Sequence, residues 1–195
     1  MAVRRSSLAA PFKPALEAVS AALDDVGGGM VIGGVAVIAR GVARTTRDVD
    51  ATVALDGDLE TLVKLLARHD LVPRIEGAIQ FAEANQVLLL RHEPSAVDVD
   101  LSIAWLPFEL EALAAAERVT LAGLEIPVAR AEDLVIYKAV AWRPQDQQDV
   151  ERLLSLHGRT MDLERIRRRV AEFAEALEDS NRVDEVERVI RRALD

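Results

Sequence analysis

The chain has 195 residues, half of them apolar, and it carries a net charge of −9 at pH 7. It contains no apolar run of about 18 residues that could span a bilayer, and no cysteine for a disulfide or a thiolate nucleophile. The acidic balance argues against a broadly basic nucleic-acid-binding surface, although a local patch could still dock RNA. We therefore expect a cytoplasmic protein that does not associate with a membrane.

Helical and strand patterns alternate along the first 130 residues, and only helical patterns follow. The expected elements in chain order are helix 13–25, strand 30–32, helix 35–39, strand 48–54, a helix capped by Asp58 and running to about residue 69, helix 75–84, strands 86–91 and 96–103, helix 107–117, a hairpin over 118–128 bent at Gly123, and helices 131–141, 145–157, 162–178 and 181–194. The change of pattern predicts a mixed core over residues 1–129 and a helical part over residues 130–195. We expect the two parts to pack together, because no flexible linker separates them.

Two features of the core indicate nucleotide chemistry. Gly33 and Gly34 follow an apolar strand, and they let the backbone turn sharply and approach a ligand closely because neither carries a Cβ atom. Asp48 and Asp50 are two apart on the next strand, so they project from one face. Their charges repel each other unless a cation lies between them, and carboxylate oxygens are ligands that Mg²⁺ prefers. A phosphate-binding turn beside a magnesium-binding pair predicts the use of a nucleoside triphosphate.

The order and spacing of these residues resemble a known superfamily. A Gly-Gly pair, a spacer of about a dozen residues and then Arg-x-Thr-x-Asp-Val-Asp over residues 44–50 is similar to the polymerase-β-type nucleotidyltransferases, and more narrowly to the bacterial AbiEii/MenT-like toxin nucleotidyltransferases. The resemblance implies an α+β fold, with a mixed β-sheet core flanked by helices and a C-terminal helical bundle. It also implies that Arg44 and Thr46 bind substrate with Gly33 and Gly34, although Arg44 could instead orient the loop. Many relatives have serine at the position of Gly34, so phosphate contact here would depend on backbone amides.

A second Asp-x-Asp pair, Asp98 and Asp100, alternates with apolar residues on the strand expected over residues 96–103. An isolated pair of this kind is most often a surface or capping feature. The resemblance, however, implies a third metal-binding carboxylate on a strand that follows the first pair, and two Mg²⁺ ions need about three carboxylates. Both residues face the same side of the strand, so both remain candidates for the third ligand.

The helical part contains a further group of charged residues: Lys138, Arg143, Asp146 and Asp149. They resemble the segment that such toxins carry on helices opposite the catalytic strands. The resemblance implies that Lys138 neutralises charge on the triphosphate and that Arg143 and Asp146 bind substrate. The alternatives are a surface lysine that pairs with an acidic residue at 132–133, and an Asp146 that caps the start of a helix.

The densest basic cluster of the chain consists of Arg165, Arg167, Arg168 and Arg169. On a helix these side chains spread around its outward faces. We expect them to form a solvated surface and not a nucleic-acid-binding patch.

Together these features predict a Mg²⁺-dependent nucleotidyltransferase that moves a nucleoside monophosphate from an NTP to a hydroxyl of an RNA, such as a tRNA 3′ end, or of a protein. The resemblance implies a bacterial toxin–antitoxin setting and therefore a cognate antitoxin. The alternative is a catalytically degenerate module that binds nucleotide or a protein partner, which the glycine at position 34 supports slightly. The two pairs of aspartates argue against it, because burying paired carboxylates without a metal is costly.

Overall fold

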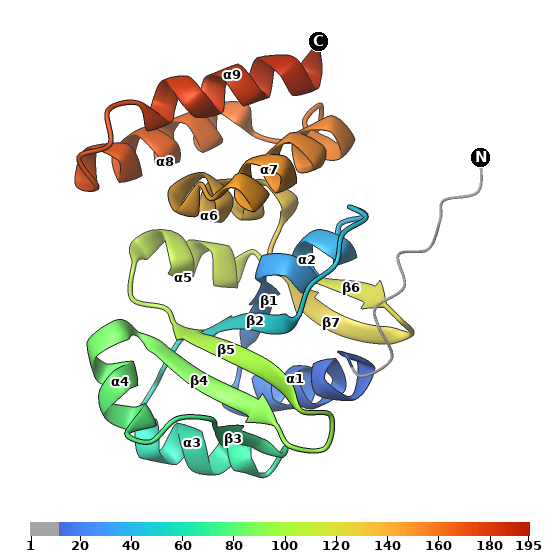
Figure 1. Cartoon of the computed structure of the whole chain (residues 1–195), viewed down its shortest axis with the longest axis vertical. Coiled ribbons are helices and arrows are strands. Elements are labelled where there is room, and N and C mark those ends of the chain that lie inside the picture. The colour runs from blue at the N-terminus through green and yellow to red at the C-terminus, as the bar shows by residue number, and fades with distance from the viewer. Residues whose placement is uncertain (1–11) are drawn as a thin grey trace. The chain divides into compact units, whose positions relative to one another are not determined.

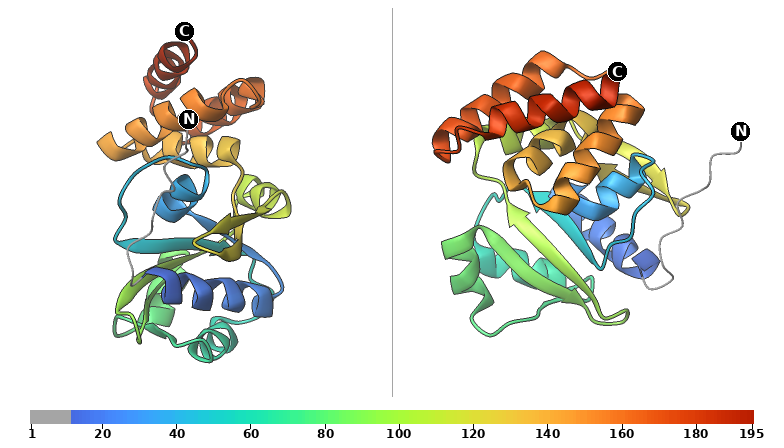
Figure 2. Two further views of the ribbon diagram at one scale, coloured as in Figure 1. Left: turned by 90° about the vertical axis from the view of Figure 1, so that its right-hand side faces the viewer. Right: turned by 45° about the horizontal axis from the view of Figure 1, so that its top comes forward.

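The computed structural model describes residues 12–195 and confirms the expected α+β class. In that range it has nine helices and seven strands, which form one mixed sheet (Figures 1 and 2). The chain divides into two compact units. The core unit contains the described residues up to Ala39 together with Ala43–Ala129, and the helical unit contains Arg40–Val42 together with Arg130–Asp195. None of the nine helices is both long enough and apolar enough to cross a membrane.

The elements of the core unit closely follow the expected order. They are α1 (Phe12–Val26), β1 (Gly29–Ile32), α2 (Gly33–Ala39), β2 (Asp48–Val53), α3 (Leu59–Ala67), β3 (Leu71–Pro73), α4 (Ala78–Asn85), β4 (Val87–His92), β5 (Val97–Ile103), α5 (Pro107–Ala114), β6 (Glu117–Leu121) and β7 (Leu124–Val128). The strand order in the sheet is β3-β4-β5-β2-β1-β7-β6. Strand β2 is parallel to β5 and antiparallel to β1, which in turn is parallel to β7.

Local sequence explains most of these elements. Along β5 every second side chain is buried, from Val97 to Ile103, and the residues between them are partly exposed. The predicted cap of α3 is confirmed, since Asp58 Oδ1 accepts a hydrogen bond of 2.7 Å from the backbone N–H of Thr61. This bond also lowers the pKa of Asp58. The hairpin of β6 and β7 turns at Ala122 and Gly123, which both have positive φ.

One strand of the sheet was not expected from the sequence. Strand β3 has only three residues, too few for the alternation that identifies a half-buried strand. It pairs with β4 at the edge of the sheet and brings the chain to Arg74. Helix α4 therefore begins at Ala78, three residues later than expected.

The helical unit contains α6 (Ala131–Ala141), α7 (Pro144–His157), α8 (Leu163–Ala176) and α9 (Arg182–Leu194), close to the four expected helices. Within this unit α6 packs against α7 and α8, and α9 packs against α7 and α8 (Figure 2). The short segment Arg40–Val42 belongs to the same unit, where a ring nitrogen of His157 lies 2.7 Å from the backbone oxygen of Arg40.

The expectation of a solvated arginine cluster on α8 is wrong for part of it. The Arg165 side chain is only 14% exposed and lies 2.7 Å from Asp133, a fully buried carboxylate that also accepts a hydrogen bond from Arg130. A buried carboxylate needs such partners to remain charged. Arg165 therefore joins α8 to α6, whereas Arg168 is exposed as expected.

Candidate active site

Strands β2 and β5 place four aspartates in matching positions. Asp48 lies beside Asp98 and Asp50 lies beside Asp100 in the parallel register, and all four are partly exposed while their neighbours on each strand are buried. Residues in register on parallel strands project to the same face of the sheet. The structure therefore gathers the four predicted carboxylates on one face, at the centre of the sheet.

The backbone of Gly33 approaches this face at Asp50. A Cβ atom built on Gly33 would lie 1.9 Å from Asp50 Oδ2, far inside any normal contact, and Gly33 has a φ of +60°. Both observations require glycine at this position. The turn that the sequence predicts thus brings a main-chain segment directly against one of the predicted metal ligands.

Gly34 makes a similar close approach to the segment that precedes β2. A Cβ atom on Gly34 would lie 2.5 Å from Thr46 Oγ1 and 3.3 Å from Arg44 Cζ. The Thr46 hydroxyl in turn donates a hydrogen bond of 3.0 Å to Asp48 Oδ1. The glycine turn, Arg44, Thr46 and the first aspartate pair are therefore one cluster in the core unit.

Replacing Gly33 with alanine should test this approach. The new Cβ atom would displace the Asp50 carboxylate, so we expect transfer activity to be lost, together with a stability loss above the roughly 1–2 kcal/mol of left-handed backbone strain. Thermal unfolding and a transfer assay measure the two effects. Gly123→Ala is the matched control, since Gly123 has a φ of +82° but nothing within 4 Å of its Cβ position. If both variants kept full transfer activity, Gly33 would have no role in the site.

Asp98 has an arginine partner on the neighbouring strand. Arg91 lies opposite it in the antiparallel pair of β4 and β5, and Arg91 Nε donates a hydrogen bond of 2.7 Å to Asp98 Oδ1. This hydrogen bond lowers the pKa of Asp98, an effect opposed by partial burial and aided by the charge of Arg74. The Arg91 side chain is 49% exposed, so it can move away at little cost.

Asp100 has a second and more firmly held arginine. Arg74 Nη1 lies 2.6 Å from Asp100 Oδ1 and also donates to the backbone oxygens of Leu90 and Val99. Its side chain is only 20% exposed. Arg74 was not predicted as a site residue. No sequence pattern identifies it, because it follows a three-residue strand and is 26 positions from its partner Asp100.

The chemistry of these donors fits Mg²⁺, which prefers carboxylate oxygens to imidazole or thiolate. In the part of the chain that the structure describes, residues 12–195, no three His, Asp or Glu side chains are already arranged to hold a metal ion. Asp98 and Asp100 each bind an arginine. Either of them could complete a cation site with Asp48 and Asp50 only if its arginine moved away.

Asparagine substitutions should identify that third carboxylate. We expect Asp98→Asn to reduce transfer by about a hundredfold or more, since its exposed arginine can be displaced and an amide lacks the anion that holds a cation. Asp100→Asn should change transfer by less than about tenfold, because Arg74 already neutralises that carboxylate. Initial rates at saturating Mg²⁺ and NTP give both values. The reverse order would assign the ligand to Asp100, and small effects at both would remove this strand from the site.

In the helical unit Lys138 is not the surface lysine of the alternative interpretation. Its side chain is 9% exposed, and its Nζ atom lies 2.8 Å from Asp146 Oδ1 and 3.3 Å from Asp149 Oδ2. Both carboxylates are almost completely buried. Lys138 on α6 thus binds two carboxylates on α7, and neither of these partners is an acidic residue at 132–133.

Asp146 also has the capping role. Its Oδ2 atom accepts hydrogen bonds from the Arg143 backbone N–H at 3.1 Å and from Arg143 Nε at 2.7 Å, at the start of α7. Burial alone would raise the pKa of Asp146, but the hydrogen bonds from Arg143 and Lys138 outweigh it and lower the pKa. The structure therefore brings Lys138, Arg143, Asp146 and Asp149 together in one network within the helical unit, in which Arg143 alone is exposed.

Similar solved structures share this fold. An antigenic nucleotidyltransferase-like protein from Paracoccidioides brasiliensis superposes with a TM-score of 0.54 at 17% identity, covering 92% of this chain and 94% of that one. JHP933 from Helicobacter pylori superposes with a TM-score of 0.54 at 13% identity, covering 96% of this chain and 92% of that one. The antibiotic-resistance factor ANT(2'')-Ia superposes with a TM-score of 0.56 at 19% identity, covering 86% of this chain and 94% of that one.

A comparison with curated proteins finds no match. A family profile, in contrast, matches nearly the whole sequence, over residues 13–192. The chain therefore belongs to the family described as nucleotidyltransferase of unknown function (DUF6036).

Proposed function

We propose that the protein is a Mg²⁺-dependent nucleotidyltransferase that transfers a nucleoside monophosphate from an NTP to a hydroxyl of an RNA or of a protein. The observation that carries the proposal is the matching register of the two aspartate pairs, with the Gly33 backbone against Asp50. Mg²⁺ held by these carboxylates would supply Lewis-acid activation of the attacking hydroxyl and charge stabilisation at the leaving oxygen. Membership of a nucleotidyltransferase family supports the reaction class.

In this proposal each residue of the core cluster has a distinct task. Asp48 and Asp50 would hold the cation that accompanies the triphosphate, and Asp98 or Asp100 would complete the second position. Gly33 and Gly34 would offer backbone amides to the phosphates, because neither carries a Cβ atom that would hold a ligand away from the backbone. Arg44, whose guanidinium carbon lies close to Gly34, would contact the same phosphates. Thr46 would orient Asp48 through its hydrogen bond.

For the helical unit we propose a change from the role expected for Lys138. Its ammonium group is buried and already shared by two carboxylates, so it would position Asp146 and Asp149 and not meet pyrophosphate directly. Arg143 is 73% exposed and is held by Asp146. Arg143 is therefore the residue of this network best suited to bind a phosphate of the substrate.

The biological setting is also a proposal. A bacterial toxin with a tRNA 3′ end as acceptor and a cognate antitoxin as partner is supported by the resemblance of residues 33–50 to the AbiEii/MenT-like proteins. A protein hydroxyl is the competing acceptor for the same chemistry.

A second candidate function has one specific observation in its favour. The guanidinium groups of Arg91 and Arg74 already neutralise Asp98 and Asp100. A catalytically degenerate module that binds nucleotide or a protein partner would have this arrangement permanently. Such a module would bind an NTP but leave no label on any acceptor.

The acceptor is best identified with each of the four α-³²P-labelled NTPs in turn, together with Mg²⁺, total RNA and cell lysate. We expect one NTP to leave acid-insoluble label that depends on Mg²⁺. Loss of the label on ribonuclease treatment would assign the acceptor to RNA, and loss on protease treatment would assign it to protein. Binding of an NTP without label in either fraction would favour the degenerate module.

A further inference from the structure

The helical unit carries a surface pocket that the proposed reaction does not use. It has a volume of about 140 Å³, and its lining consists of Trp142, Gln147, Glu185, Arg188, Val189 and Arg192. The four residues from α9 are spaced to share one face of that helix, while the other two come from the junction of α6 and α7. Sites for drug-sized ligands occupy about 300–1,000 Å³, so this pocket suits a single planar ring.

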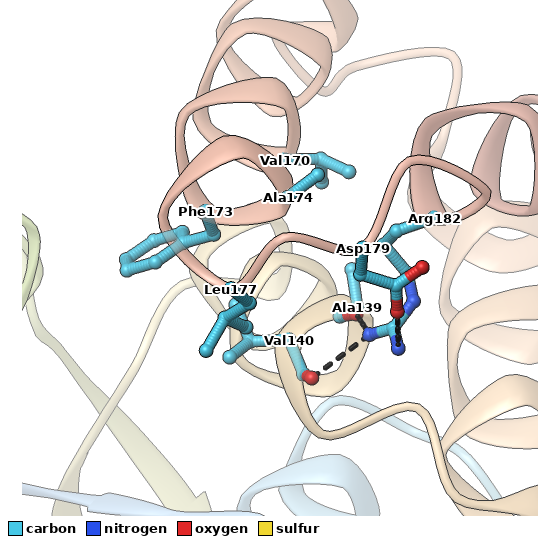
Figure 3. Close-up of a pocket in the computed structure, with 8 residues that line it drawn as sticks. All are labelled: Ala139, Val140, Val170, Phe173, Ala174, Leu177, Asp179 and Arg182. Atoms are coloured by element: carbon cyan, nitrogen blue, oxygen red, sulfur yellow. Dashed lines mark hydrogen bonds and ion pairs between the residues drawn. The ribbon is translucent and has the colours of Figure 1, made fainter.

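The indole of Trp142 forms part of the pocket wall and has an arginine over its ring. Trp142 ends α6 with a φ of +50°, an uncommon conformation for a bulky residue, and its backbone N–H donates to the Lys138 oxygen at 2.8 Å. The Arg182 guanidinium lies 5.5 Å from the centre of the ring. Arg182 is fixed in turn by the Val140 oxygen at 2.8 Å and by Asp179 at 2.6 Å (Figure 3). A preorganised aromatic surface binds a flat ligand without a further ordering cost.

Arginines line the same pocket. Arg188 and Arg192 are both exposed. Arg188 Nε donates to the backbone oxygen of Asp184, and Arg192 Nε lies 3.8 Å from Glu151. These contacts use Nε, so the terminal nitrogens of both side chains can donate to a ligand. A guanidinium has five N–H donors, which suit the paired oxygens of a phosphate. The acid in the lining, Glu185, lies 3.8 Å from Arg182. The pocket lining itself thus contains two arginines and one glutamate, on an otherwise acidic chain.

We propose that this pocket binds one nucleotide of a single-stranded RNA, with the base against Trp142 and the phosphate held by Arg188 and Arg192. Aromatic rings that stack on bases, beside cations that follow the backbone, are the general means of binding single strands. An acidic peptide would use the arginines but gain nothing from the ring. The proposal depends on the proposed function only for RNA as acceptor, because binding itself needs neither Mg²⁺ nor NTP.

The test uses a Trp105→Phe background, which leaves Trp142 as the single tryptophan of the chain. Titration with an unstructured octaribonucleotide in EDTA should quench its fluorescence. In fluorescence anisotropy with end-labelled RNA, Trp142→Ala should weaken binding at least about tenfold and Trp142→Phe much less. The double variant Arg188→Ala/Arg192→Ala should also weaken binding. It should reduce the slope of log Kd against log salt concentration by about 0.7, because the two arginines together neutralise one phosphate.

Arg191→Ala is the matched control, because Arg191 is 72% exposed on the same helix but does not line this pocket. It should change Kd less than twofold. Three results would each overturn the proposal. They are an equal loss of RNA affinity in the control and the double variant, no quenching of Trp142 fluorescence by RNA, and binding of a poly-glutamate peptide as tight as that of RNA. Asp50→Asn should bind RNA normally, so failure of the transferase assignment would remain distinguishable from failure of this site.

Discussion

Replacing Asp50 with asparagine is expected to abolish nucleotidyl transfer, with a rate loss of about a thousandfold or more. The Asp50 carboxylate lies against the Gly33 backbone, and Asp50 lies beside Asp100 of the second aspartate pair. Its side chain therefore adjoins both the glycine turn and the second pair. An amide preserves the shape of the side chain and removes the anion that holds the cation. A loss of about 4 kcal/mol in transition-state stabilisation corresponds to that factor. Initial rates of label incorporation at saturating NTP and Mg²⁺ measure it.

The fold should survive this substitution, because removing one of several like charges on a shared face relieves repulsion. We expect the midpoint of thermal unfolding to stay constant or to rise slightly. Asp56→Asn is the control, since Asp56 lies just after β2 and outside the cluster. Full transfer by folded Asp50→Asn would exclude Asp50 as a metal ligand.

The second large effect is expected at Lys138. Lys138→Met keeps the approximate length of the side chain and leaves two almost completely buried carboxylates without their ammonium partner. Removing one side of a buried ion pair typically costs about 3–5 kcal/mol. We expect a loss of that order in the free energy of unfolding, measured by urea denaturation. Lys64→Met, on the exposed side of α3, should change stability by less than about 0.5 kcal/mol.

The size of this loss distinguishes a positioning role from a direct role in catalysis. Adding Asp146→Asn and Asp149→Asn to Lys138→Met removes the buried carboxylate charges that have lost their partner. The triple variant should therefore recover part of the lost stability. If Lys138 acts only by positioning, NTP affinity should fall in parallel with stability and recover in part with it. Wild-type stability with strongly reduced NTP affinity in Lys138→Met would instead support direct contact with the triphosphate.

The local features of the site could be predicted from the sequence, and the pairings that complete it could not. The alternation of aspartates with apolar residues on β2 and β5 is a local property, so the shared face of each pair could be predicted. The register that puts Asp48 beside Asp98 joins residues 50 positions apart and depends on the whole sheet. The positions of Arg74 and Arg91 depend on the same pairing.

The helical unit shows the same limit. The helices were predicted closely because apolar periodicity extends over several turns. The surface interpretation paired Lys138 with an acidic residue at 132–133, because these acids lie nearby on the same expected helix. Its observed partners lie on the next helix, and their burial is a tertiary property.

The most direct test of the central claim compares two labels on the same NTP. With the NTP identified by the acceptor screen, parallel reactions contain either the α-³²P or the γ-³²P form, with Mg²⁺ and the acceptor fraction. Nucleotidyl transfer predicts that the α label enters the acceptor, and that the γ label is released as pyrophosphate in equal amount. Asp50→Asn should show neither product. Entry of the γ label into the acceptor, or release of pyrophosphate without α label in any macromolecule, would contradict the assignment.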